Sequence, residues 1–339
     1  MMSAMWKLSV AIGVACVACK GGTPAGDDPS DDTDLPGTGS ETDTDTDTDT
    51  DTYTPPTETY DCSTLPDRPT VWNRMDNIPM SEDFTIDTDG YLWGVNAETT
   101  ALVKTLYGGT PELVVPSVSS WGRGTRFLST GDLVIAEPDG GQLIRVDVTT
   151  GSVTPVVGDL QEPNGIAVDE DDWVYLTEMN GRVNRINPYG GERSVIFDNP
   201  VSTDGITFSP DYSTLYWNSE SGEVIQAEID AEGAIVGTPS VLALIDDMAF
   251  FDLLDGMTAD VCGNLYVVRM SGYIVRVTPQ GQQEVVVDLT GVPGGVFISA
   301  ANFGSGFGGF ERENLYVMNL NGGVFEIEMG IPGKWEPHL

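Results

Sequence analysis

Short apolar segments recur along the chain from Cys62 onward, and turn residues separate them. Each copy begins with a polar residue, and successive copies start 41, 41, 40, 51 and 47 residues apart. A turn rich in Asp, Gly, Ser or Pro follows each start, and then an apolar and aromatic segment such as residues 265–267. Strands of four to six residues with alternating patterning predict one four-stranded antiparallel meander per copy. The six copies start at Glu82, Arg123, Asn164, Asp204, Asp255 and Asn302.

Six units of about 40 residues are the signature of a six-bladed β-propeller, so the fold class is predicted to be all-β. The last unit supplies only three strands, whereas residues 71–75, ahead of the first unit, match the pattern of an outer strand. We therefore expect the N-terminal segment to supply the outer strand of the last blade. Such a closure joins the ends of the ring and hides two sheet edges.

The first 61 residues follow other patterns. Residues 1–18 contain one lysine and an apolar run of eleven residues, which is typical of a signal peptide and too short to span a bilayer. Cleavage before Cys19 would leave a cysteine for lipidation, as in bacterial lipoproteins, whereas Cys16 fits less well and plain secretion is the alternative. We expect an exported, extracytoplasmic protein that is anchored in the membrane by this lipid alone.

Residues 19–61 are expected to form a disordered acidic stalk rich in Thr and Asp. From Gly21 to Asp61 there are thirteen acidic residues and no Lys or Arg. Such a segment cannot bury enough apolar area to offset the entropy cost of ordering. A calcium-binding acidic repeat is the alternative interpretation. The propeller is then expected to span residues 62–339.

The net charge and the histidine content argue against several classes of partner and catalytic site. The chain has 15 Lys and Arg residues against 53 Asp and Glu residues, a formal net charge of −38. This excess makes nucleic acid and bare anionic membrane poor partners. The only histidine is His338, which argues against Ser-His-Asp or Cys-His catalysis and against a His-ligated zinc or iron site. We expect a monomer.

Two cysteines lie outside the signal region, Cys62 and Cys262. An oxidising compartment permits a disulfide between them, and this bridge would fix the closing N-terminal segment to the fifth blade. Two independent buried thiols are the alternative.

The polar residues at the starts of the innermost strands are expected to ring one mouth of a central channel. The second strand of each blade returns to the same face, so its end residues should surround that ring: Asn96, Glu137, Glu178, Ser219, Arg269 and Asn319. Three carboxylates that converge in a narrow channel require a cation or strong donors, because uncompensated buried charge is costly. Oxygen ligands favour a hard divalent ion, and Ca²⁺ over Mg²⁺. Turn capping by these side chains is the alternative.

Several of these segments resemble the regucalcin/gluconolactonase family, the senescence-marker-protein, gluconolactonase or LRE-like propellers. The resemblance covers about residues 81–330, and residues 255–257 with the strand at 263–267 are its most specific part. It implies a six-bladed propeller that holds one divalent cation, usually calcium, through a blade-one glutamate, asparagines and an Asp-Gly aspartate.

Transferred to this sequence, the resemblance places Glu82 and Asn164 among the metal ligands and makes Asp255 both ligand and general base. Asp204 stands where the family usually has asparagine, and it completes the expected ligand set. Residues 161–163 replace an arginine that sugar-lactonase members tend to carry, so a sugar-acid lactone is weakly supported as the substrate.

Two functions are compatible with these residues. In the first, the domain is a metal-dependent hydrolase of a small lactone or ester. Its expected catalytic residues are Asp255, which takes a proton from water, and Arg123, which steadies an oxyanion or an anionic substituent; Arg269 is the alternative for this second role. The expected substrate contacts are Arg123, Arg269, Glu178 and Asn302. In the second, it is a surface-displayed binding module with a structural calcium. The largely retained ligand pattern favours the hydrolase.

Overall fold

The computed structural model describes residues 60–69, 72–76, 78, 82–96, 98–247 and 252–338. The expected signal peptide, the lipidation site Cys19 and the stalk up to residue 59 lie outside these residues, and the expected boundaries at residues 18 and 61 stay predictions. Among the described residues, no helix has the length and apolar character needed to cross a membrane.

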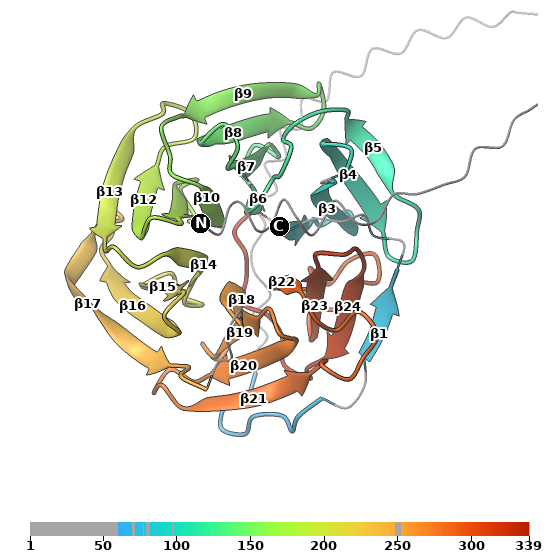
Figure 1. The fold of residues 1–339 in the computed structure, drawn as a ribbon, viewed down its shortest axis with the longest axis vertical. Coiled ribbons are helices and arrows are strands. Elements are labelled where there is room, and N and C mark those ends of the chain that lie inside the picture. The colour runs from blue at the N-terminus through green and yellow to red at the C-terminus, as the bar shows by residue number, and fades with distance from the viewer. Residues whose placement is uncertain are drawn as a thin grey trace, which may run out of the picture. The chain divides into compact units, whose positions relative to one another are not determined.

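The described strands form six four-stranded antiparallel sheets that surround one central axis (Figure 1). Blade one consists of β2 (Phe84–Ile86), β3 (Tyr91–Asn96), β4 (Ala101–Leu106) and β5 (Glu112–Val115). Blade two consists of β6 (Thr125–Phe127), β7 (Leu133–Glu137), β8 (Gln142–Asp147) and β9 (Ser152–Val157). Blade three consists of β10 (Pro163–Val168), β11 (Val174–Glu178), β12 (Arg182–Ile186) and β13 (Arg193–Asp198).

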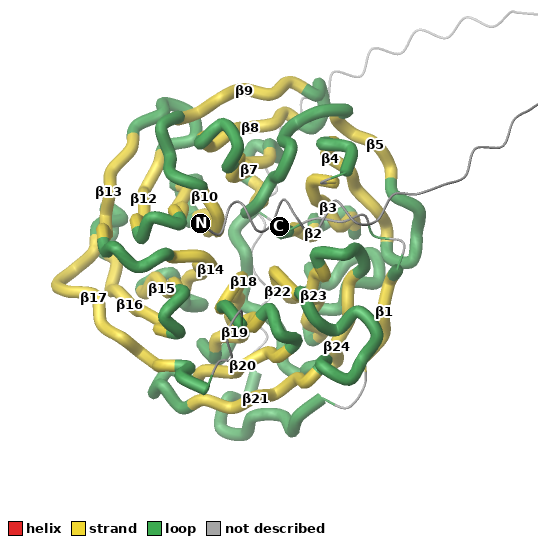
Figure 2. Tube along the Cα trace, viewed as in Figure 1, coloured by secondary structure: helices red, strands yellow, loops and turns green. Residues whose placement is uncertain are grey.

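The second half of the ring has the same organisation, and the connections that the structure describes are loops and turns (Figure 2). Blade four consists of β14 (Thr203–Phe208), β15 (Thr214–Ser219), β16 (Glu223–Ile229) and β17 (Ile235–Leu244). Blade five consists of β18 (Leu254–Ala259), β19 (Leu265–Arg269), β20 (Tyr273–Val277) and β21 (Gln283–Asp288). Blade six consists of β22 (Ile298–Phe303), β23 (Asn314–Asn319), β24 (Val324–Glu328) and β1 (Trp72–Met75).

The N-terminal strand closes the ring. β1 pairs antiparallel with β24, from Trp72 opposite Ile327 to Met75 opposite Val324. The sheet order of blade six is β1-β24-β23-β22, so the chain's earliest described strand is the outer strand of its last blade. The predicted fold class and the predicted closure are both confirmed.

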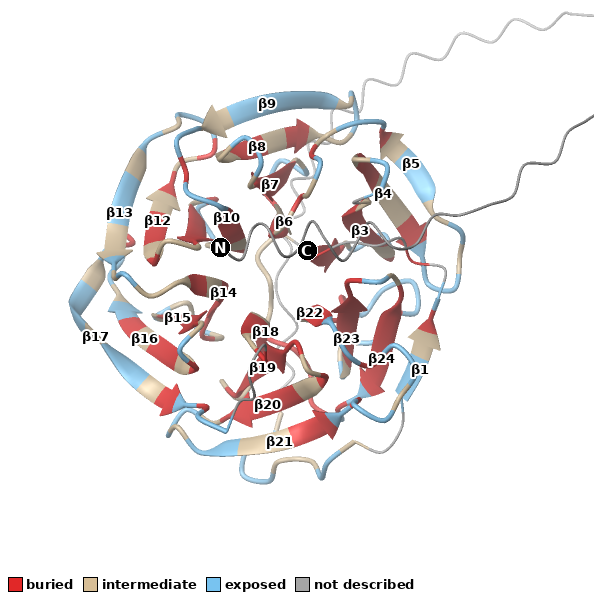
Figure 3. Ribbon diagram, in the orientation of Figure 1, coloured by how far each residue is buried: buried red, intermediate tan, exposed pale blue. Residues whose placement is uncertain are grey.

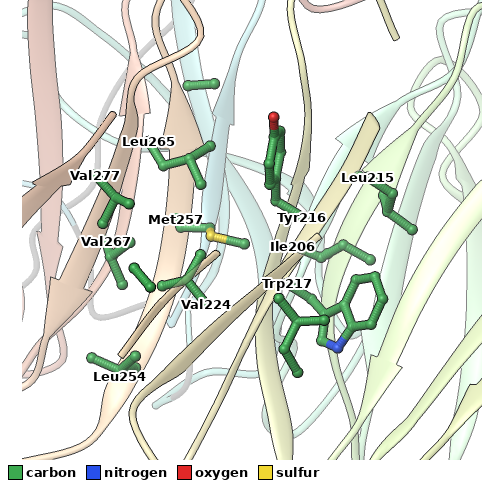
Figure 4. Close-up of a cluster of buried hydrophobic side chains, with 14 of the residues drawn as sticks. Ile206, Leu215, Tyr216, Trp217, Val224, Leu254, Met257, Leu265, Val267 and Val277 are labelled. Carbon is green, nitrogen blue, oxygen red and sulfur yellow. The ribbon is translucent and has the colours of Figure 1, made fainter. Parts of the chain in front are cut away.

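Burial falls from the axis to the rim of each blade (Figure 3). β7, β11 and β19 are buried along their whole length, whereas β9 is exposed over its first four residues. Neighbouring blades cover both faces of the second strands, which are therefore largely continuous apolar runs. The outer strands face water on one side. Figure 4 shows the packing between blades four and five, where Trp217 and Ile206 belong to the same apolar cluster as Met257 and Leu254.

A disulfide joins Cys62 to Cys262, with the two Cα atoms 5.6 Å apart. This is the pair that the sequence favoured. Nearby, the Tyr60 hydroxyl donates a hydrogen bond to the main-chain oxygen of Gly330 at 3.0 Å. Leu65 packs against the apolar cluster of blades five and six. The segment that precedes the closing strand is therefore attached to both blades.

Candidate metal centre

Strand pairing assigns one equivalent position in every blade to the mouth of the channel. In blades three to six, the inner strand begins with a residue opposite the end of the second strand, as Thr203 stands opposite Ser219 and Leu254 opposite Arg269. The next residue along is the ring position. In blades one and two the first paired residues of the inner strands are Phe84 and Thr125. The ring position lies two residues before each of them. The ring therefore consists of Glu82, Arg123, Asn164, Asp204, Asp255 and Ser299.

Five of these six residues are those that the sequence predicted, but the expectation that Asn302 begins the inner strand of blade six is wrong. That strand begins at Ile298, and Asn302 lies three residues beyond the ring position. Its Nδ2 donates a hydrogen bond to the main-chain oxygen of Phe84 at 2.7 Å, inside the channel wall. The error has a physical origin, because blade six has Ser299 and Ala300 where blades three to five have Asn or Asp followed by Gly.

The second expected ring is found at the ends of the second strands. β3 ends at Asn96, β7 at Glu137, β11 at Glu178, β15 at Ser219, β19 at Arg269 and β23 at Asn319. Because the inner and second strands are antiparallel, these ends return to the mouth at which the first ring lies.

Three carboxylates of the first ring converge. Glu82, Asp204 and Asp255 each offer a carboxylate oxygen, and these oxygens lie within 4.8 Å of one another. Glu82 and Asp255 are buried, and Asp204 has intermediate exposure. Asn164 is also buried, and its Nδ2 donates to Asp204 Oδ2 at 2.9 Å. All four predicted ligands line one cavity at this end of the channel.

Close approach of neighbouring inner strands brings these side chains together. Gly165, Gly205 and Gly256 directly follow Asn164, Asp204 and Asp255 in the chain. A Cβ atom at Gly205 would collide with the main-chain oxygen of Asp255, and one at Gly165 would collide with that of Asp204. A residue without a side chain is therefore required at these positions, where one backbone packs directly on the next.

Burial shifts the acidity of the three carboxyl groups. It raises the pKa of Glu82 to about 8 and the pKa of Asp204 to about 7, and it raises the pKa of Asp255 well above its usual range. Repulsion adds to the shift, since Asp204 raises the pKa of both Glu82 and Asp255. The guanidinium of Arg123 acts in the opposite sense on all three. The group therefore carries more negative charge than its protein surroundings compensate.

Arg123 is the cationic member of the ring. Its Nη1 atom is buried and has no hydrogen-bond partner among the described residues. A buried guanidinium nitrogen without a partner retains its capacity to donate a hydrogen bond to an anionic oxygen.

The other residues expected to contact substrate are held by protein partners. Arg269 is buried, donates from Nε to Asp252 Oδ2 at 3.0 Å, and forms an ion pair with Asp247 at 3.0 Å. Glu178 is fully buried and accepts a hydrogen bond from Asn184 Nδ2 at 2.8 Å. Their role as substrate contacts stays a prediction.

A buried ion pair below the ring was not predicted from the sequence. Asp83 occupies the position that holds Gly or Ala in the other five blades. Its carboxylate accepts hydrogen bonds from Phe84 N at 2.7 Å and Thr125 N at 3.2 Å, and it pairs with Arg126 Nη1 at 2.8 Å. Arg126 lines the cavity of the ring and also the next cavity along the channel. The sequence contained one sign of this ion pair, namely the charged Asp83 at a position where the other blades have Gly or Ala.

The donor set suits a divalent cation. Glu82, Asp204 and Asp255 supply carboxylate oxygens, and Asn164 adds an amide oxygen without any His or Cys ligand. Sets of ligands that consist of oxygen atoms alone select hard divalent ions. These residues are able to hold such an ion, which would compensate their charge.

Comparisons with known proteins show which family this chain resembles and over which residues. The sequence model of the SMP-30/gluconolactonase/LRE-like region matches residues 174–320, from β11 in blade three to β23 in blade six. No curated protein matches the chain. The family match therefore covers the later blades and leaves Glu82, Arg123 and Asn164 outside it.

Solved structures show the same fold. Regucalcin from Agrobacterium tumefaciens, a calcium-binding protein, is 21% identical with a TM-score of 0.62, covering 78% of this chain and 96% of its own. A gluconolactonase from Xanthomonas campestris is 18% identical with a TM-score of 0.61, covering 76% of this chain and 88% of its own. Virginiamycin B lyase from Staphylococcus aureus is 17% identical with a TM-score of 0.54, covering 76% and 82%. The chain thus shares its propeller fold with these proteins and resembles the SMP-30/gluconolactonase/LRE-like family over blades three to six.

Proposed function

We propose that this protein is a metal-dependent hydrolase of small lactones or esters, with its active site at the ring mouth of the channel. The convergence of Glu82, Asp204 and Asp255 within 4.8 Å carries the proposal. The match to the SMP-30/gluconolactonase/LRE-like model and the shared fold with a gluconolactonase support it.

Glu82, Asp204 and Asp255, together with Asn164, would hold the ion. Asn164 donates to Asp204 through Nδ2, so its Oδ1 atom remains available as a ligand. Bound there, a divalent cation supplies Lewis-acid polarisation of a carbonyl group. Asp204 gives the site one more carboxylate than the resemblance implies, which favours a dication over a monovalent ion.

Asp255 is assigned the proton transfer. Its Oδ1 accepts a hydrogen bond from Gly256 N at 3.0 Å, which fixes the orientation of the carboxylate. Asp255 takes a proton from a water molecule as the water oxygen bonds to the carbonyl carbon. When the carbon–oxygen bond of the ester breaks, Asp255 returns that proton to the leaving alkoxide. Burial makes the carboxylate more basic than an exposed aspartate by raising its pKa, which suits this role.

Arg123 is assigned the stabilisation of negative charge. Its unpartnered Nη1 donates to the carbonyl oxygen as that oxygen gains charge during the attack of water. Arg269 is already paired with Asp252 and Asp247, so we assign it a structural contribution to the mouth and leave Arg123 as the principal cation.

A panel of lactones and esters tests the proposal. The purified chain is assayed with calcium and again with excess chelator, in parallel with the Asp255→Asn variant. We expect turnover that requires the metal and disappears in the variant. Turnover that survives both chelation and the Asp255→Asn substitution would overturn the assignment.

A binding module with a structural calcium is the second candidate. The observation that favours it is the satisfaction of Glu178 and Arg269 by protein partners, which leaves few polar groups free to select a substrate. In this case the cation holds the six blades together at the ring, and the mouth binds a ligand without turnover. Metal binding with no activity on any lactone or ester would favour this function.

We also propose that the propeller is displayed outside the cytoplasm on a lipid anchor at Cys19. The signal-like residues 1–18 and the acidic residues 19–61 support this proposal. Mass spectrometry of the N-terminal peptide tests it, since a diacylated cysteine should be the first residue. An unmodified amino terminus on protein from the secreted fraction would contradict it.

A further inference from the structure

The last described residues form a strap across the far end of the channel, opposite the ring. This C-terminal strap comprises residues 331–338. Lys334 N donates to the main-chain oxygen of Ala259 at 3.0 Å, and Ala259 is the last residue of β18, at the opposite end from Asp255. The main-chain oxygen of Trp335 accepts a hydrogen bond from a blade-four tyrosine hydroxyl at 2.8 Å. The strap therefore runs from blade five to blade four.

A small chamber lies between the strap and the inner strands. The polar and charged residues in its wall include Thr85, Arg126, Thr258, Ser305, Arg312, Lys334 and Glu336. The space available to the centres of water-sized atoms is about 30 Å³, which is enough for about two waters or one small ion. Arg126 also lines the cavity of the ring, so this side chain separates the two cavities.

One hydroxyl group in this wall lacks a protein partner. Ser305 is 4% exposed, and its Oγ atom is buried without a hydrogen-bond partner among the described residues. Thr85 and Thr258, which lie in the same wall, are buried as well. Buried hydroxyls normally have a partner, so a donor left unpaired beside a cavity points to a ligand in that cavity.

Among the described residues, one cation in the wall of the chamber has no carboxylate partner. Arg126 pairs with Asp83 at 2.8 Å, and Lys334 pairs with Glu336 at 2.8 Å. Arg312, in contrast, has neutral partners. Its Nη2 donates to the main-chain oxygen of Gly333 at 3.0 Å, and its guanidinium lies 4.2 Å from the centre of the Trp335 ring. Within this set of ion pairs, Arg312 is therefore the cation whose charge no carboxylate partner offsets.

We propose that this chamber binds a small monovalent oxyanion of the carboxylate type. The Arg312 guanidinium supplies the charge, and the Ser305 hydroxyl supplies a donor. One negative charge matches the single surplus cation, whereas a dianion would leave one charge uncompensated in a partly closed space. The anion would link the C-terminal strap, through Lys334 and Trp335, to blade six. The site is independent of the proposed hydrolase activity.

Titration calorimetry with sodium formate tests this site in the full chain in the presence of calcium. We expect saturable binding that weakens at least tenfold in Arg312→Gln and at least threefold in Ser305→Ala. Ser305→Ala is the smaller change, so it still tests the site if Arg312→Gln fails to fold. Thr207→Val is the matched control for Thr258→Val, because the two threonines occupy equivalent register positions and only Thr258 lines the chamber. Formate affinity should fall in Thr258→Val and stay unchanged in Thr207→Val.

Four results would overturn the proposal. The first is the absence of saturable formate binding, and the second is an unchanged affinity in Ser305→Ala and Arg312→Gln. The third is loss of formate binding in Asp255→Asn, which would place the anion at the ring. Inorganic phosphate that binds tenfold more tightly than formate would also contradict the assignment to a monovalent anion.

Discussion

The two ends of the central channel are built by the same six strands and carry opposite charge. At the ring, the first residues of the inner strands bring three carboxylates together, Glu82, Asp204 and Asp255. At the far end, Arg126, Arg312 and Lys334 surround a small chamber. The repeated backbone thus fixes where side chains meet, and single residues at equivalent positions decide the chemistry. The Asp83–Arg126 pair lies between the two ends and joins an acid of the ring side to a cation of the far side.

The largest expected effect is at the ring. Asp255→Asn keeps the shape of the side chain but removes its charge and basicity, so turnover should fall by about 100-fold to 10,000-fold. Asp204→Asn is the matched control, because it removes a neighbouring carboxylate that has no assigned proton transfer. Steady-state kinetics at saturating calcium should show activity in Asp204→Asn, and equal losses in the two variants would contradict the assignment of the base.

The pair between the two ends should dominate stability. Asp83→Asn leaves Arg126 buried without its carboxylate, which should lower the free energy of unfolding by about 3 kcal/mol. Urea denaturation monitored by tryptophan fluorescence measures this change. Asp76→Asn is the control, since Asp76 forms an ion pair with Arg74 at 2.7 Å but its side chain is 79% exposed. Exposed pairs contribute about 0 to 1 kcal/mol, so similar losses in both variants would contradict a buried role for Asp83.

A pH series should separate the calcium-free from the calcium-bound ring. In the unfolded chain, Glu and Asp side chains have their ordinary pKa values of 4.5 and 3.8, whereas folding raises the pKa of Glu82 to about 8 and that of Asp204 to about 7. Between about pH 5 and pH 8 the folded state binds more protons than the unfolded state, so stability falls as pH rises. Without calcium, we therefore expect the free energy of unfolding to fall steadily over this range.

Saturating calcium should flatten this pH dependence, because the cation favours the ionised carboxylates. Chemical denaturation at several pH values, with calcium and with chelator, gives the comparison. A calcium-free chain whose stability rises between pH 5 and pH 8 would show that the three carboxyl groups are not destabilised by burial.

The smallest effect is expected at the far end of the strap. His338 Nε2 lies 3.0 Å from Asp172 Oδ1, and both side chains are largely buried. His338→Ala should lower the free energy of unfolding by about 1 kcal/mol, the usual contribution of one hydrogen bond. Thermal melts should therefore shift by a few degrees, while calcium affinity at the distant ring stays the same. A changed calcium affinity would mean that the two ends are coupled.

The sequence predicted the ring well because its signal is periodic. A polar residue followed by glycine marks the inner strands of blades three to five, and that pattern located Asn164, Asp204 and Asp255. It failed in blade six, where Ser299 and Ala300 replace the marker and the polar Asn302 stands nearby. The closing strand β1 was likewise located from the sequence, because residues 71–75 match the pattern of the outer strands and the last blade lacks one.

The far end could not be predicted, because it depends on contacts between segments that share no pattern. The C-terminal strap has no repeat, and its position follows from hydrogen bonds such as Lys334 N to Ala259. The partners of Arg269 were not predicted for the same reason, since Asp247 and Asp252 lie outside the repeated strands, between β17 and β18. Such pairings are set by tertiary geometry and leave no trace in local spacing.

Calcium binding tests the central claim, that the ring of the channel is a metal centre. Titration calorimetry of the chelator-treated chain with calcium, followed by melting at increasing calcium concentration, measures both affinity and linkage. If the ring is a metal centre, calcium binds saturably and stabilises the fold by about 2.7 kcal/mol at a hundredfold excess over the dissociation constant. Glu82→Gln should weaken both. If the chain shows no heat of binding, and chelator leaves its melting temperature unchanged, the ring is not a metal centre.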